Sequence, residues 1–448
     1  MQAKAQDWRG QNDNIFGFQF SIEPMDEKES FVVNVWSQGI NDGKKRPVWV
    51  WLHGGGYSGG SGNQMPAFDG CSLAEKGDIV VVSVNHRLNV LGYVDLRGLG
   101  GKYTESVNLG MQDLVAALKW VNQNIENFGG DPERVTIDGQ SGGGGKVSTL
   151  MGMPSAKGLF HRAIIQSGSY LKVAEGELSK TYGLTFAKAL GVTSENAEKI
   201  NDFSYEELVI AGRDATKMMT EEGYNNIRRI INPTVDGKYI VQHPFYPDVP
   251  EYSKDVAMII GSNLYETGAR NRQLITPQTM EQVKATLTKR YGAENTDEYI
   301  AAYKEAYPDD DQPQHIPATF IRTNALKQAA IKNAQGGAPV YMYLFEWQSP
   351  VNDGSLGACH GMELPFVFNN IGMARTLTGG GKDAYEMADK MSSAWINFVK
   401  TGDPNCKELP NWAPYTSEKG ATMIFDNKCK VVYNHDKKLV DLVESIQQ

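Results

Sequence analysis

The chain has 448 residues, of which 41% are hydrophobic and 10% aromatic, enough apolar material for a packed globular protein. The formal net charge is −9 and the sequence contains no cluster of Lys and Arg, which argues against a nucleic acid as a partner. The longest apolar runs, such as residues 47–52 and 79–84, are far too short to cross a bilayer, so no membrane span is expected.

The amino terminus and the cysteines bear on the cellular compartment. Residues 1–10 are polar and lack the apolar run of a secretory signal, which predicts a cytoplasmic protein as written. A secreted or periplasmic protein is the alternative if a signal segment was removed. The four cysteines have no CxxC or zinc-ligand spacing, so we expect free thiols and no metal site, with a bridge between Cys406 and Cys429 as the alternative.

The first third of the chain alternates between strand-like and helix-like patterns. Residues 31–36 alternate inward and outward positions, and 47–52 and 79–84 are short β-rich runs. Between 108 and 128, apolar residues recur at steps of four, three and four positions, which places them on one face of a helix. A short strand at 135–137 follows. This alternation predicts an α/β fold with a mostly parallel sheet, whose functional residues lie at the carboxyl ends of the strands.

The rest of the chain contains two long helical segments between further strands. Strand-like runs return at 256–261 and 340–345, whereas 172–230 and 276–333 are polar and rich in helix-forming residues. No internal repeat or Pro/Ser-rich linker separates them. We therefore expect a single domain over residues 1–448, in which the two segments are helical insertions that cap a site.

The pattern G-x-S-x-G occurs twice, centred on Ser141 and on Ser58. Ser141 follows the strand at 135–137 and precedes a predicted helix that reaches Met151. A strand, a tight turn and a helix are the context of a nucleophile elbow. Ser58 instead opens a loop of further glycines. The sequence predicts Ser141 as the nucleophile, and the alternative is a serine that caps a helix in a glycine-rich turn.

A second motif, HGGG at residues 53–56, follows the strand at 47–52. In the α/β-hydrolase fold, a loop of this kind supplies backbone N–H groups to the oxyanion, and glycines permit that close approach. Two motifs in the order of this fold predict an α/β-hydrolase. A flexible loop is the alternative for the glycines, and His53 is more typical of a residue that supports the loop than of a base.

The catalytic base is expected downstream of Ser141, because this fold orders its triad as serine, acid, histidine. His315, His360 and His435 are the candidates. His360 follows the strand at 340–345 and precedes a glycine, so it is favoured. The other two lie in polar surroundings that are more typical of solvated surface histidines.

Three carboxylates compete for the role of the acid. Glu266 comes just after the strand at 256–261, at the end where functional residues lie, whereas Asp236 and Asp255 lie in turns. A carboxylate here orients the imidazole and stabilises the imidazolium ion. The sequence favours Glu266, with the two aspartates as alternatives.

A series of segments resembles the type-B carboxylesterase family, which includes cholinesterases and bacterial para-nitrobenzyl esterases. The matching segments include HGGGY (53–57), NHRLNVLGY (85–93), GLFHRAIIQSGS (158–169), HGMELPFVF (360–368) and AWINFVKTGDPN (394–405). The resemblance implies an α/β-hydrolase fold and ester hydrolysis through an acyl-enzyme, without a metal or organic cofactor.

The resemblance also assigns roles to individual residues. It implies a catalytic triad of Ser141, Glu266 and His360. It also implies three oxyanion donors, namely Gly55, Gly56 and Gly142. Ser167, in QSGS, matches a serine that supports the acid, with a plain turn serine as the alternative.

The chain departs from the family pattern beside the nucleophile. Gln140 and Gly142 replace the usual Glu and Ala of Gly-Glu-Ser-Ala-Gly, and Asp138 stands where an aromatic residue is common. Gln140 removes a negative charge, which disfavours a cationic substrate.

These patterns predict a serine carboxylesterase acting on small-molecule esters. A lipase, a thioesterase or an amidase with the same triad is the alternative among enzymes, and a non-catalytic cholinesterase-like binding protein is the alternative outside them. Retention of the three triad residues favours the enzyme. The sequence leaves acyl and alcohol preference and the oligomeric state open.

Overall fold

The computed structural model describes residues 31–225, 227, 230–266, 278–318 and 320–446. The polar segment 1–10 lies outside the described residues, as do positions 226, 228–229, 276–277 and 319 of the two predicted cap segments. Within the described residues, no helix is both long and apolar enough to cross a membrane.

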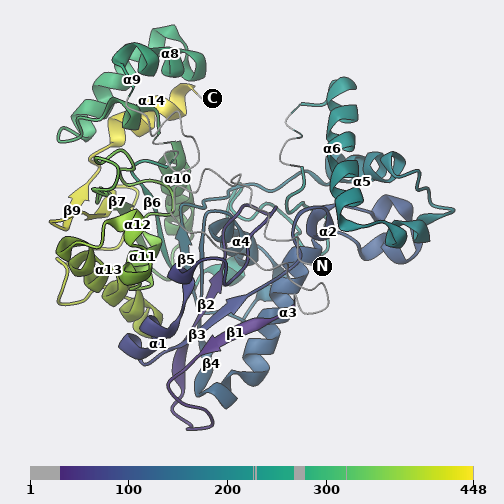
Figure 1. Cartoon of the computed structure of the whole chain (residues 1–448), viewed down its shortest axis with the longest axis horizontal. Coiled ribbons are helices and arrows are strands. Elements are labelled where there is room, and N and C mark those ends of the chain that lie inside the picture. The colour runs from purple at the N-terminus through teal and green to yellow at the C-terminus, as the bar shows by residue number, and fades with distance from the viewer. Residues whose placement is uncertain (1–30, 226, 228–229, 267–277, 319, 447–448) are drawn as a thin grey trace.

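A single twisted sheet forms the centre of the described chain (Figure 1). Its nine strands, in the order β1-β3-β2-β4-β5-β6-β7-β8-β9, are β1 (Val33–Trp36), β2 (Arg46–Leu52), β3 (Val80–Val84), β4 (Gly130–Gln140), β5 (Arg162–Gln166), β6 (Ala257–Asn263), β7 (Val340–Phe345), β8 (Ala421–Phe425) and β9 (Lys430–Tyr433). Only the outer strands β1 and β9 run antiparallel to their neighbours. The prediction of an α/β fold with a mostly parallel sheet is confirmed.

The helices cover the sheet and extend beyond it. They are α1 (Cys71–Gly77), α2 (Asn89–Tyr93), α3 (Leu109–Asn124), α4 (Gly142–Met151), α5 (Gly176–Ala189), α6 (Tyr205–Glu221), α8 (Met280–Tyr291), α9 (Ala293–Ala306), α10 (Phe320–Gln335), α11 (Leu364–Val367), α12 (Arg375–Thr378), α13 (Lys382–Thr401) and α14 (Lys437–Ile446).

Strand β2 is buried on both faces, which is why its sequence reads as a continuous apolar run. Val48 and Val50 pack into a core with residues of α3, α4 and α10. Trp49 and Trp51 point the other way, into a core with residues of α11 and α13. The alternation of a strand therefore builds two apolar layers, one on each side of the sheet.

The two predicted cap segments behave differently from each other. Helices α5 and α6 of the first segment pack together around their own cluster, which includes Phe186 and Met219, and they lie at one end of the molecule (Figure 1). In the second segment, α8 and α9 lie beside α14 at the other end, but α10 buries Ala325 and Ala329 in the core beneath the sheet. The division into one domain with two cap insertions stays a prediction, and α10 is a helix of the sheet layer.

The four cysteines all lie within the described residues, and each is a free thiol. The structure contains no bridge between Cys406 and Cys429.

Candidate active site

Ser141 occupies a strained turn between β4 and α4. Its backbone has φ 59° and ψ −124°, a conformation that costs free energy for a residue with a side chain, and its amide donates a 2.8 Å hydrogen bond to the carbonyl of Gln166 on β5. The turn brings α4 against β2, because an ideal Cβ on Gly143 would lie only 2.0 Å from the carbonyl oxygen of Leu52. Only glycine permits this approach. The strand, turn and helix predicted for Ser141 are therefore present.

The HGGG loop lies directly against this turn. Gly55 and Gly56 have positive φ angles of 88° and 65°. An ideal Cβ on Gly142 would lie 2.2 Å from the carbonyl oxygen of Gly56, so the loop and the first turn of α4 are in backbone contact. The three predicted oxyanion donors thus gather beside Ser141.

Glu266 and His360 form a buried pair at the carboxyl ends of β6 and β7. His360 Nδ1 donates a 2.5 Å hydrogen bond to Glu266 Oε2, and the amide of Asn263 donates to Glu266 Oε1 at 2.8 Å. The two loops are joined by a backbone bridge between Tyr265 and Cys359, and Asn263 Nδ2 donates to the Cys359 carbonyl at 2.7 Å. The carboxylate and the imidazole are therefore held in a fixed relative position.

The other ring nitrogen of His360 faces Gln140, in the turn that carries Ser141. Since Nδ1 donates to Glu266, Nε2 is the acceptor, and Gln140 Nε2 lies 3.3 Å from it. Gln140, directly before Ser141, thus contacts His360 through an uncharged amide. Ser141 and His360 line the same cleft.

The structure separates the rival serine and histidines from this site. Ser58 is exposed. His315 is buried, in contrast to the expectation of a surface residue, and its Nδ1 lies 2.9 Å from Asp310. His435 lies beside Asp436, and burial lowers the pKa of His435 to about 4. Of the three candidate bases, only His360 lines the cleft with Ser141.

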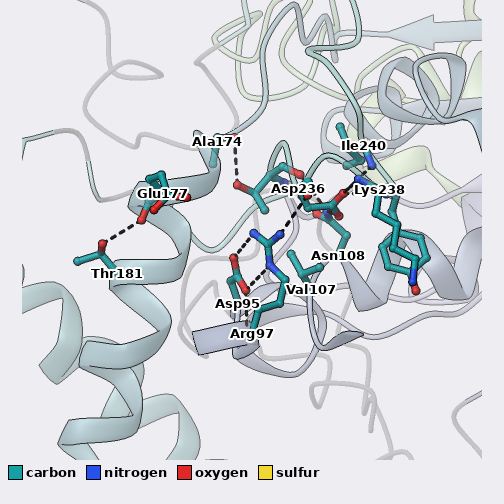
Figure 2. A network of polar contacts seen from close by, with 12 residues as sticks. Asp95, Arg97, Val107, Asn108, Ala174, Glu177, Thr181, Asp236, Lys238 and Ile240 are labelled. Carbon is teal, nitrogen blue, oxygen red and sulfur yellow. Dashed lines mark hydrogen bonds and ion pairs between the residues drawn. The ribbon is translucent and has the colours of Figure 1, made fainter. Parts of the chain in front are cut away.

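The rival acids also lie elsewhere. Asp236 accepts hydrogen bonds from Asn108 Nδ2 at 2.6 Å and from backbone amides of its own turn, and its carbonyl accepts one from Arg97 (Figure 2). Its carboxylate is therefore part of a structural hydrogen-bond network between loops. Asp255 is exposed and precedes β6, at the opposite end of the strand from Glu266.

Ser167 lies at the end of β5 with a positive φ of 49°, and its amide donates to the carbonyl of Gly261 at 2.9 Å. Its hydroxyl is buried and has no hydrogen-bond partner among the described residues. The support of Glu266 by Ser167 stays a prediction.

Two further buried carboxyl groups, Glu363 and Asp138, lie near Glu266. Burial, together with the charge of Glu266, raises the pKa of Glu363 to about 8, and Asn263 Nδ2 donates to Glu363 Oε2 at 2.5 Å. Burial also raises the pKa of Asp138 well above its ordinary value, and Glu363 adds to the effect. Both carboxyl groups therefore favour the protonated form at neutral pH. Sequence reasoning missed Glu363, although it lies three positions after His360.

The cleft has a volume of about 1200 Å³. Its lining includes Gly56, Ser141 and His360, together with residues 169–175 and residues of α10 and α14. In the described part of the chain, no group of three or more His, Cys, Asp or Glu side chains could hold a metal ion. A serine beside a carboxylate-oriented imidazole and backbone N–H groups is an arrangement suited to acyl transfer.

Known proteins match this chain over nearly its whole length. The family model described as "Carboxylesterase family" matches residues 5–441. The para-nitrobenzyl esterase of Bacillus subtilis (strain 168) is 30% identical over 430 residues, which cover 94% of this chain and 84% of the relative. The phenmedipham hydrolase of Pseudarthrobacter oxydans is 32% identical over 415 residues, which cover 90% of this chain and 80% of the relative.

Among solved structures, an esterase from Clostridium hathewayi, described as able to hydrolyse aliphatic aromatic polyesters, aligns with a TM-score of 0.85 and 33% identity. The alignment covers 100% of this chain and 88% of that one. These matches confirm the α/β-hydrolase fold and the resemblance to para-nitrobenzyl esterases. The chain belongs to the carboxylesterase family and is a carboxylic ester hydrolase.

Proposed function

We propose that the chain hydrolyses small-molecule carboxylic esters through an acyl-enzyme on Ser141, with His360 as the base and Glu266 as the acid. The observation that carries the proposal is the 2.5 Å hydrogen bond between Glu266 and His360 in the cleft that also contains the strained Ser141. Orientation of the imidazole and exposure of the serine to a substrate are the two requirements of a nucleophile activated by a base.

The reaction takes place in two transfers. Ser141 Oγ attacks the ester carbonyl while His360 Nε2 takes its proton, and the N–H groups of Gly55, Gly56 and Gly142 donate to the oxyanion. His360 then gives the proton to the leaving alcohol. Water attacks the acyl-enzyme with His360 again as base, and the acid is released as Ser141 regains its proton.

The backbone conformation of Gly55 predicts that Gly55→Ala lowers turnover, because its φ of 88° is strained for any residue with a side chain. A methyl group would also lie 2.3 Å from the Gly59 carbonyl oxygen, so the loop that carries two oxyanion donors must shift. Loss of one such donor typically costs about 10²- to 10³-fold in kcat. We expect a loss of this order for para-nitrophenyl acetate.

Gly59→Ala is the matched control for this change. It lies in the same loop, and an ideal Cβ there meets no atom within 4 Å. We expect its kcat to equal that of the wild type. An unimpaired Gly55→Ala enzyme would remove Gly55 from the oxyanion site.

The cleft supports a second, narrower candidate for the substrate. Its volume is about 1200 Å³ and its lining includes Ser141, Tyr415 and residues of α14, which leaves room for more than a short acyl group. The related Clostridium hathewayi esterase is described as hydrolysing aliphatic aromatic polyesters. An extended ester chain that lies along the cleft is therefore a candidate beside simple esters.

A series of para-nitrophenyl esters of increasing acyl length, run beside a para-nitroanilide of matched acyl group, tests the proposal. We expect ester turnover to persist to long acyl chains and the anilide to react far more slowly. Comparable rates for ester and anilide would favour an amidase. No turnover of any ester by folded protein would favour a non-catalytic binding protein.

A further inference from the structure

Lys146 is a fully buried lysine in the second turn of α4, five positions after Ser141. Its Nζ donates a 2.8 Å hydrogen bond to the carbonyl oxygen of His53, the first residue of the HGGG loop. Nζ also lies 6.0 Å from the centre of the Tyr57 ring, at the far end of the same loop. Burial lowers the pKa of Lys146 to about 7. In the described chain, no carboxylate forms an ion pair with it.

Two histidines accompany Lys146. The rings of His53 and His86 stack with centroids 5.1 Å apart. The Nδ1 atoms lie 2.8 Å from the Gly54 carbonyl and 2.9 Å from the Arg87 carbonyl, so each ring donates to the backbone. Burial, and after it the charge of Lys146, holds the pKa of both histidines well below the ordinary value. Both rings are therefore neutral.

The remaining titratable groups around Lys146 add no net charge. Burial raises the pKa of the Tyr57 and Tyr93 hydroxyls well above the ordinary value, so both stay protonated. The charge of Arg87 is balanced by Asp113, whose Oδ1 lies 2.6 Å from Arg87 Nη2. Protonated Lys146 is thus an unbalanced positive charge directly beneath the oxyanion loop.

We infer that Lys146 is a positioning residue for ester hydrolysis: it anchors the HGGG loop through the His53 carbonyl, and its positive charge stabilises the oxyanion held by that loop. The inference rests on the proposed function, since it requires that Gly55 and Gly56 bind the oxyanion. Burying an unpaired ammonium ion is costly, and a charge in a water-excluded interior acts over a longer range than in water. The buried ammonium ion is accounted for by its use as a fixed charge, placed where negative charge develops in the transition state.

The effect has a defined pH dependence. Below pH 7 Lys146 is charged in the folded state, and above it the amine is neutral but still donates to His53. The unfolded lysine titrates near 10.5, so the unfolded state binds more protons between these values and the stability cost of Lys146 falls as pH rises. The charge should therefore aid turnover most, and destabilise the fold most, below pH 7.

Lys146→Met tests the inference, with Lys332→Met as its matched control. Lys332 is also buried, its Nζ donates to the Lys254 carbonyl at 2.9 Å, and burial lowers its pKa to about 8, but it lies on α10 outside the cleft lining. We measure kcat and KM for para-nitrophenyl acetate between pH 6 and 9, together with Tm. The ratio of wild-type to variant kcat at each pH reports the effect of removing the Lys146 side chain.

At pH 6.5 we expect Lys146→Met to lose at least about tenfold in kcat with KM within twofold, and to melt no lower than the wild type. The loss should shrink toward pH 9. Lys332→Met should keep its kcat. A Lys146→Met kcat within twofold of wild type, an equal loss at every pH, or a lowered Tm at pH 6.5 would overturn the inference.

A second variant and a labelling experiment separate a failure of this inference from a failure of the proposed function. If Lys146→Met does not fold, Lys146→Gln replaces it, because the amide retains a donor for the His53 carbonyl without the charge, and the same criteria apply. A fluorophosphonate probe is applied to every variant. If Ser141 is not labelled in the wild type, the proposed function fails, whereas labelled Ser141 with an unchanged Lys146→Met kcat contradicts only the role of Lys146.

Discussion

Ser141→Ala is expected to abolish both labelling by a fluorophosphonate probe and turnover of para-nitrophenyl esters. The phosphonylated serine resembles the tetrahedral intermediate, so the label requires a hydroxyl that has both an activating imidazole and oxyanion donors beside it. Loss of such a nucleophile typically costs about 10⁶-fold in kcat. Peptide mapping of the labelled wild-type protein should find the adduct on Ser141 alone.

Ser58→Ala is the control, because Ser58 is the centre of the second G-x-S-x-G pattern. Its side chain is exposed and does not line the cleft that contains His360. The variant should be labelled like the wild type and keep its kcat. An adduct on Ser58, or residual turnover near the wild-type rate in Ser141→Ala, would contradict the assignment of the nucleophile.

Two strands that are buried throughout are predicted almost to their observed bounds. Residues 340–345 were predicted as a strand and form β7 with the same bounds, and the predicted run 47–52 differs from β2 by one residue. β5, β8 and β9 were not predicted. β9 is an edge strand with no buried residue, so it lacks the apolar run that identifies the others.

The placement of α10 depends on tertiary contacts that no periodicity reveals. Its sequence is polar enough to resemble the neighbouring helices α8 and α9. Two small residues, Ala325 and Ala329, one turn apart, allow it to pack closely against β6 and β7. A stripe this narrow does not distinguish a sheet helix from a surface helix in the sequence alone.

The chain order of the fold and the ends of the strands sufficed to select Ser141, Glu266 and His360 from the sequence. They could not show how the rival residues are placed. Asp236 accepts a hydrogen bond from Asn108, and His315 is buried beside Asp310, and both contacts are visible only in three dimensions. Lys146 was missed because a lysine in a helix is usually solvent-exposed. The only signal was its position in GGGGKVSTLM, a segment that is otherwise without charge.

Glu266→Gln is expected to fold normally and to lose about 10⁴-fold in kcat, the order of effect seen when a triad carboxylate becomes an amide. His360 Nδ1 donates to Glu266 Oε2 at 2.5 Å, while the amide of Asn263 donates to the other oxygen. A glutamine has one oxygen acceptor for these two donors. If that oxygen accepts from Asn263, the NH₂ group faces Nδ1 and favours the tautomer with its proton on Nε2, which cannot accept the proton of Ser141. The amide also supplies no negative charge to the imidazolium ion.

The matched control for this change is Asp255→Asn, which alters an exposed carboxylate at the other end of β6 and should leave kcat unchanged. Steady-state kinetics with para-nitrophenyl acetate and a thermal melt of each variant provide the comparison. The loss in Glu266→Gln should fall on kcat rather than KM, because the carboxylate acts on the imidazolium of the transition state and does not touch the substrate. It should also persist as the pH is raised, since raising the pH cannot restore a charge that the amide lacks. A folded Glu266→Gln enzyme with a wild-type kcat would mean that another group orients His360, and the buried Glu363, whose pKa is raised to about 8, would then be the next residue to change.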